Sequence, residues 1–145
     1  MRPPWSRPEH EFLARCTGCG ECIEACATGV IVPWRRTPVI DFHRGECTFC
    51  GDCARACPEG LFLDPDGTPP WKVQIRLASH CLSLVGVECR ICGDHCETRA
   101  IGFRLAPGGV ARIRIDDALC TGCGACVAPC PEDAIRIVVN PGGGA

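Results

Sequence analysis

The sequence predicts an α+β protein made of two small domains in tandem, each of the form (βαβ)2. Two observations predict this fold. One cysteine-rich motif recurs four times, beginning near Cys16, Cys47, Cys81 and Cys120. In addition, 145 residues with 16 cysteines are too few for two ordinary hydrophobic cores, and domains of that size need another source of stability. The fold is therefore expected to be stabilised by whatever its cysteines bind.

Each of the four motifs contains the same succession of elements. A tight loop of cysteines leads into a short helix, and a brief run of β-branched and large apolar residues follows, which is typical of a strand. The helices are expected around the last cysteine of each motif, within residues 21–26, 52–57, 93–101 and 125–130. The strand-like runs lie at 30–32, 61–63, 101–103 and 134–139.

Four strand pairings are predicted from these runs and from the turns between them. The predicted pairs are 30–32 with 39–42, 101–105 with 111–115, 72–77 with 134–139, and 11–14 with 61–63. The first two cross short turns and are expected to be hairpins. The other two join distant segments, and they would close two similar halves of the chain.

The chain is expected to divide near its middle, where DPDGTPP is dense in turn formers and contains a Pro-Pro pair. The predicted organisation is an N-terminal tail (1–11), a first domain (12–64), a linker (65–71), a second domain (72–139) and a C-terminal tail (140–145). The N-terminal tail contains Arg2-Pro3-Pro4-Trp5. It is expected to be either a disordered segment or an exposed tryptophan anchor for a partner.

Three of the motifs have the spacing C-x2-C-x2-C-x3-C, which is a strong indication of [4Fe-4S] clusters. Three closely spaced thiolates can wrap three irons of one cube, while the fourth, displaced along the chain, reaches the other cluster of a pair. Structural zinc is the competing interpretation of any C-x2-C pair, but a zinc site has no use for the third and fourth cysteine of each motif. Disulfides are expected only in an oxidising compartment.

Pairing the motifs in sequence order predicts four ligand sets for four [4Fe-4S] clusters. The sets are Cys16, Cys19, Cys22 and Cys57; Cys26, Cys47, Cys50 and Cys53; Cys81, Cys89, Cys92 and Cys130; and Cys96, Cys120, Cys123 and Cys126. A nested pairing, in which the first motif joins the fourth and the second joins the third, stays open. The 23 residues between Cys57 and Cys81 are long enough to form a hairpin for it.

The third motif departs from the common spacing, because LSLVGVE is inserted between Cys81 and Cys89. Two interpretations of Cys81 follow. It is either the first ligand of the third cluster or a free thiol, in which case the chain holds three [4Fe-4S] clusters. His80 and His95 each precede a cysteine, but all four sets are complete without a histidine, so neither is assigned a role.

Charge and motif content exclude several classes of function. The formal charge of −2 becomes about −10 once sixteen thiolates hold four oxidised cores, so nucleic acid is not an expected partner. No apolar run approaches the roughly 20 residues of a membrane span. Residues 1–15 lack the apolar stretch of an export signal, and no G-x-G-x-x-G loop follows a strand. We therefore expect a cytoplasmic electron carrier, without a membrane span, that is not itself an enzyme.

The complete pattern is similar to tandem bacterial-type ferredoxin domains, and longer phrases extend the similarity. These phrases are RPPWS, HEFLARCTGCGECIEAC, DFHRGECTFCGDCARACPEGLF, CLSLVGVECRICGDHCETRAIGF and CTGCGACVAPCPEDAI. Together they resemble the NapF family, the ferredoxin-type proteins of periplasmic nitrate reductase systems. The insertion in the third motif and the RPPW segment make this resemblance more specific than the cluster motifs alone.

The resemblance implies a cytoplasmic accessory that contacts the catalytic subunit of periplasmic nitrate reductase before its export. Such an accessory would assist maturation of that molybdenum-containing subunit by supplying electrons. The alternative is a generic polyferredoxin that serves as an electron-transfer subunit of a respiratory redox complex. The two hypotheses differ in timing, because an accessory binds an immature subunit transiently, whereas a redox subunit stays in the mature complex.

Overall fold

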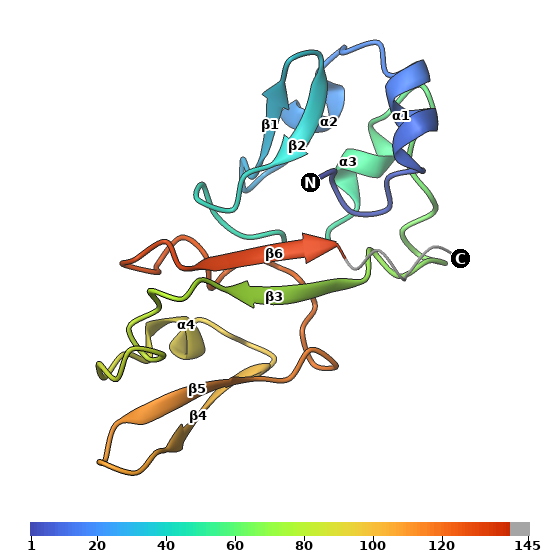
Figure 1. Cartoon of the computed structure of the whole chain (residues 1–145). Helices are drawn as coiled ribbons and strands as arrows, with labels where there is room; N and C mark the ends of the chain where they lie inside the picture. The colour runs from blue at the N-terminus through green and yellow to red at the C-terminus, as the bar shows by residue number, and fades with distance from the viewer. Residues whose placement is uncertain (140–145) are drawn as a thin grey trace. The chain divides into compact units, whose positions relative to one another are not determined.

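The computed structural model describes residues 1–139, which form two compact units: a first unit of residues 1–72 and a second unit that begins at Val73 (Figure 1). Each unit combines short helices with two-stranded antiparallel pairings, as expected of an α+β chain. The division falls just beyond the predicted linker. The predicted C-terminal tail lies outside the described residues. None of the helices in residues 1–139 is long and apolar enough to span a membrane.

The first unit contains three helices and one hairpin, with the bounds α1 (Glu9–Arg15), α2 (Glu21–Glu24), β1 (Ile31–Trp34), β2 (Thr37–Ile40) and α3 (Asp52–Arg55). Strands β1 and β2 pair antiparallel from Ile31 opposite Ile40 to Trp34 opposite Thr37, which confirms the first predicted hairpin. The turn uses Arg35 with a left-handed backbone, φ 58°, as a tight hairpin requires.

The predicted strand at residues 11–14 is wrong, because this segment lies within helix α1. Pro8 precedes the helix and cannot continue a strand ladder, Glu9 and Glu11 occupy the first turn, and Arg15 occupies the last. These charges suit the helix dipole. The partner of residues 61–63 is instead the segment before the helix, through a bridge between Ser6 and Phe62.

The expectation of an N-terminal tail is also wrong. Residues 1–7, here called the N-terminal arm, pack into the first unit: Pro3 and Pro4 are fully buried, and Trp5 is 5% exposed. The backbone N–H of Trp5 donates to Pro70 O, and its indole Nε1–H donates to Thr68 O, both at 2.8 Å. An exposed tryptophan anchor is therefore excluded.

The second unit has the bounds β3 (Val73–Leu77), α4 (Ile91–Asp94), β4 (Ile101–Leu105), β5 (Ala111–Ile115) and β6 (Ile135–Val139). Strands β4 and β5 form a hairpin with five residue pairs, and β3 pairs with β6 over five more, both antiparallel. Both predicted pairings are confirmed. The pairing of β3 with β6 joins the beginning of the second unit to its last described strand.

The LSLVGVE insertion, here called the insert loop (residues 82–88), is fastened to the free edge of β5. The Ser83 hydroxyl donates to Ala111 O at 3.0 Å and accepts from Ile113 N–H at 2.7 Å. The Glu88 carboxylate accepts from Ala111 N–H at 3.0 Å. These side chains satisfy backbone groups that no strand pairs, so the insert loop covers an edge that would otherwise be open.

Helices α2 and α3 lie within their predicted ranges but end before the last cysteine, and α4 begins two residues before the range predicted for it. Helices α2, α3 and α4 contain Cys22, Cys53 and Cys92, the third cysteine of their motifs rather than the last. Each has only four residues. In the fourth motif, the residues around Cys126 form consecutive turns instead of a helix, and Pro129 supplies no N–H with which to extend one.

Candidate iron–sulfur centres

The first predicted set of cysteines comes together around one cavity in the first unit. Cys16, Cys19 and Cys22 approach from the first motif, and Cys57 approaches from the end of the second. The remaining walls are largely apolar and include Phe12, Leu61 and Phe62. Helix α1, which contributes Phe12, thus positions an aromatic ring beside the cysteines.

The second set lines a separate cavity in the same unit. Cys47, Cys50 and Cys53 belong to the second motif, and Cys26 is the last cysteine of the first. Pro4 and Trp5 of the N-terminal arm line the same cavity. The arm therefore lies beside the second set, a role that the sequence interpretation missed because it placed these residues in a tail.

The third set includes Cys81, the cysteine whose role was open. Cys81, Cys89, Cys92 and Cys130 line one cavity of the second unit, together with Ile113 from β5 and Ile135 from β6. Cys81 is 8% exposed. The insertion thus lengthens the loop between the first two cysteines without removing Cys81 from the set.

The fourth set is identified by electrostatic proximity. The Cys126 thiol lies among Cys123, Cys120 and, from the neighbouring set, Cys92, and Cys120 in turn interacts with Cys96. The same crossing is seen in the first unit, where Cys53 interacts with Cys26, the last cysteine of the first motif, and also with Cys22 of the neighbouring set. Each unit therefore holds two adjacent sets that exchange their last cysteines. These proximities favour the sequential pairing over the nested one.

Each set has at least one thiol that is buried deeply enough to oppose its ionisation. Burial, and then the charges of neighbouring cysteines, raise the pKa of Cys22 and Cys92 to about 11 and that of Cys53 and Cys126 to about 12. Four thiolates gathered in a poorly solvated cavity require a compensating positive centre. This donor set fits iron, which binds thiolates and neutralises their charge.

In the first and third motifs, the last cysteine, which joins the set of the neighbouring motif, has a hydrogen bond to its sulfur. Cys26 Sγ lies 3.6 Å from Thr28 Oγ1, and Cys96 Sγ lies 3.7 Å from Thr98 Oγ1. Burial raises the pKa of Cys26, but the Thr28 hydroxyl and three backbone N–H groups outweigh it, so the pKa falls below its ordinary value. The C-x-T spacing at both positions was the sequence signal that could have identified these threonines.

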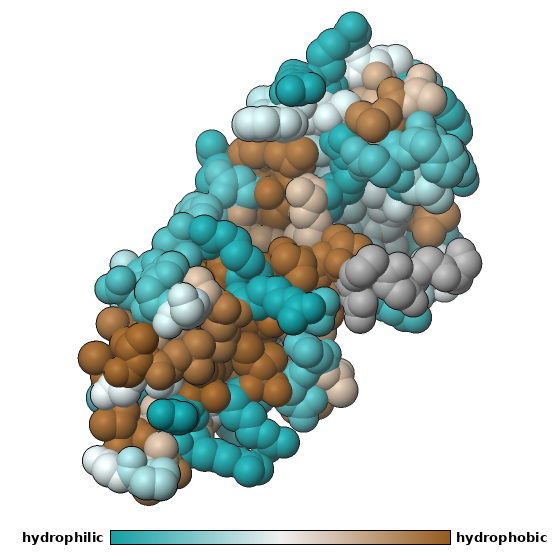
Figure 2. All heavy atoms as spheres, viewed as in Figure 1, coloured by the Kyte–Doolittle hydropathy of each residue, from teal (hydrophilic) through white to brown (hydrophobic). Residues whose placement is uncertain are grey.

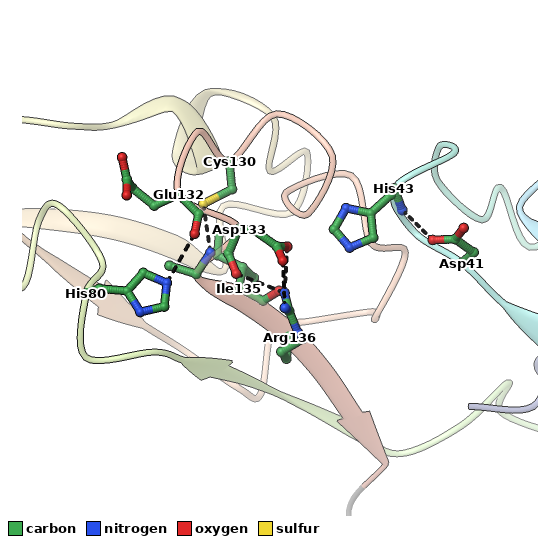
Figure 3. A network of polar contacts seen from close by, with 9 residues as sticks. Asp41, His43, His80, Cys130, Glu132, Asp133, Ile135 and Arg136 are labelled. Atoms are coloured by element: carbon green, nitrogen blue, oxygen red, sulfur yellow. Dashed lines mark hydrogen bonds and ion pairs between the residues drawn. The ribbon is translucent and has the colours of Figure 1, made fainter.

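The last cysteines of the other two motifs are followed by proline, and one of them accepts a backbone hydrogen bond. Cys130 Sγ accepts from Ala134 N–H at 3.3 Å (Figure 3). His80 points toward the same turn and contacts Glu132 O at 3.1 Å, while His95 Nδ1 contacts its own helix at Ile91 O. Both histidines thus contact backbone carbonyl oxygens.

A single metal ion fits these sites poorly. Within residues 1–139, no three His, Cys, Asp or Glu side chains converge on a position that one ion would occupy. Zinc needs four ligands at about 2.0–2.3 Å from one point. A four-iron cube holds its thiolates farther apart, which is compatible with four cysteines arranged around a cavity.

The comparison with known families agrees with this class of site. The 4Fe-4S dicluster domain family matches residues 15–61 and 87–134, one match in each half of the chain. The protein is therefore an iron–sulfur protein of the ferredoxin type, with two dicluster domains in tandem. Proteins of this class carry electrons rather than convert substrates.

Relatives narrow the class. Ferredoxin-type protein NapF of Haemophilus influenzae is 46% identical over 138 residues, which cover 94% of this chain and 78% of that protein. NapF of Escherichia coli K12 is 44% identical over 136 residues, covering 93% and 82%. The methylamine utilization ferredoxin-type protein MauM of Paracoccus denitrificans is 34% identical, covering 95% and 70%. The chain belongs to the NapF family of ferredoxin-type proteins, which confirms the resemblance noted in the sequence.

Proposed function

We propose that the four cysteine sets hold four [4Fe-4S] clusters in two bacterial-ferredoxin-like (βαβ)2 domains, and that the protein passes single electrons through them. The observation that carries this proposal is the exchange of last cysteines, because Cys57 lies with Cys16, Cys19 and Cys22 although 34 residues lie between it and the nearest of them. A pair of adjacent clusters is the arrangement that needs such an exchange.

The chain's own residues prepare the sites for this role. Bound clusters supply one-electron chemistry. Phe12 and Leu61 keep water from the first set, and Trp5 does the same at the second. Thr28, Thr98 and the Ala134 N–H hold thiolate sulfurs in hydrogen bonds, and such bonds help to set the reduction potential of a cluster.

The biological role that we propose is that of a cytoplasmic accessory to periplasmic nitrate reductase. It would bind the catalytic subunit before export and deliver electrons during its maturation. Membership of the NapF family supports this partner, and the sixteen cysteines, all within residues 1–139, form no disulfide, which is compatible with a reducing compartment. A MauM protein related over most of the chain keeps the alternative of a more general redox subunit open.

Two measurements test the proposal. Anaerobic iron and sulfide analysis of the purified protein should give roughly 16 irons per chain, and roughly 12 would indicate three clusters instead. An anaerobic pull-down from the host cytoplasm should recover the unexported catalytic subunit. Recovery of a mature respiratory complex in its place would favour the electron-transfer subunit, and a colourless zinc protein would contradict both.

A further inference from the structure

The insert loop is held in one conformation at both ends. Ser83 is 2% exposed and makes two hydrogen bonds to β5, and Glu88 accepts a third while pairing with Arg90 at 2.6 Å. Between these anchors, the N–H groups of Leu84 and Val85 donate to Cys81 O. A loop fixed in this way loses little conformational entropy when a partner binds it.

The tip of this fixed loop exposes large apolar side chains. Leu84 is 41% exposed, Val85 58% and Val87 48%. Apolar side chains gather over the segment between β3 and α4 in Figure 2, where this loop lies. Three neighbouring apolar residues on a rigid protrusion are unusual for a surface that only meets water.

A cluster of arginines lies on the hairpin to which the loop is attached. Ile113 of β5 lines the cavity of the third set, and side chains alternate along a strand, so Arg112 and Arg114 are on the opposite face. Arg104 of β4 is directly opposite Arg112. These three residues, here called the arginine face, are exposed, and none has a carboxylate partner among residues 1–139.

Like charges placed directly opposite each other on neighbouring strands are destabilising. The strand pairing alone gives no reason for Arg104 to face Arg112, whereas an external anion would remove the repulsion. The anchors of the insert loop contact Ala111 and Ile113, the residues on either side of Arg112, so the loop is attached beside the arginine face. Apolar residues beside arginine are the composition of a protein-binding surface.

We infer that the loop tip (Leu84, Val85 and Val87) and the arginine face form one docking surface for an acidic protein surface bordering an apolar hollow. This inference rests on the proposed function and assigns the surface to the nitrate reductase catalytic subunit. Docking there places the partner beside β5, whose inner face lines the third cysteine set. Electrons would then leave the protein at its second unit.

The test is an anaerobic measurement of Kd between the holoprotein and the purified catalytic subunit at several salt concentrations. The variant R104E/R112E/R114E should weaken binding at least tenfold and reduce its salt dependence, because the interacting charges have been reversed. The variant L84S/V85S should weaken binding severalfold and keep the salt dependence. Iron content should stay unchanged in both, and R104Q/R112Q/R114Q should give an intermediate loss.

A matched control separates this face from the total charge. The variant R44E/K72E/R76E makes the same change in charge at three exposed cations outside the hairpin, and it should bind nearly as wild type does. If this control weakened binding as much as the arginine variant, or if the arginine variant bound as tightly as wild type, the docking inference would be wrong while the proposed function stood. If wild type failed to bind the catalytic subunit, the proposed function would fall, and this assignment with it.

Discussion

The two units share one cysteine scheme but close their sites in different ways. In the first unit, the N-terminal arm and its neighbours form an aromatic cluster, in which Trp5 meets Phe49 edge-on at 6.4 Å and Phe49 meets Trp71 at 5.9 Å. In the second unit, the core is aliphatic, and the insert loop is fastened to β5 through side-chain hydrogen bonds. The cysteine scheme is therefore the same in the two units, while its surroundings differ.

This difference has a consequence for electron transfer. The reduction potential of a [4Fe-4S] cluster depends on solvent exposure and on hydrogen bonds to its sulfurs. Pro4 and Trp5 of the N-terminal arm line the second set, whereas the second unit begins directly with β3. The clusters proposed for the two units are thus expected to have different potentials, and such a difference favours transfer in one direction.

The largest expected effect is loss of a cluster when a crossing cysteine is removed. Cys57→Ser and Cys130→Ser change equivalent positions, one in each unit, and each should lower the iron content from roughly 16 to roughly 12 per chain. Anaerobic iron analysis measures the loss, and EPR spectroscopy of the reduced protein identifies the affected unit. A loss in the opposite unit would contradict the sequential assignment.

Removal of the arm's tryptophan should be the next largest effect. Trp5→Ala deletes a side chain that is 5% exposed, and such truncations cost about 3–5 kcal/mol of unfolding free energy. The clusters of the first unit should also become more sensitive to oxygen, because Trp5 lines the second cavity. Thermal unfolding and the rate of bleaching in air measure the two effects.

Trp34→Ala is the matched control for this prediction. Trp34 is 64% exposed in β1, so its removal should change the unfolding free energy by only about 0.5 kcal/mol. Equal destabilisation by the two substitutions would show that burial of the arm is not the cause.

Loss of the Ser83 hydrogen bonds that attach the insert loop to β5 should have a smaller effect. Ser83→Ala leaves Ala111 O and Ile113 N–H without their partner, which should cost about 1–3 kcal/mol. Amide hydrogen exchange should accelerate at β5 and leave the first unit unchanged. Val85→Ala, at the exposed tip of the same loop, should leave exchange at β5 as in wild type.

The smallest effect concerns the ion pair that fastens the arm. A hydrogen bond from Arg2 holds the pKa of Glu9 below its ordinary value of 4.5, so the pair stabilises the fold above that pH and is lost as pH falls through the lowered value. Glu9→Gln should cost about 0.5 kcal/mol or less. The difference in melting temperature from wild type should stay constant between pH 6 and pH 8. A difference that varied within this range would implicate another group.

Sequence alone predicted the cysteines that each motif brings close together and most of the strand pairing. The spacing of each motif specifies which three thiolates stay together, since two or three intervening residues leave little freedom. The hairpin through residues 106–109 and the pairing of β3 with β6 were predicted from local turn signals and apolar runs. These features depend on neighbours in the sequence or on a repeated pattern.

Only the tertiary structure decided the positions of the N-terminal arm and the insert loop. A segment that reads as a proline-rich tail becomes core because Trp5 finds its partners at Thr68 and Pro70, more than 60 residues away. The hydrogen bonds of Ser83 likewise depend on an edge of β5 that exists only once the hairpin has formed. The local spacing of the cysteines determines what they bind. The burial of the N-terminal arm and the insert loop depends instead on contacts with distant segments, which local spacing does not specify.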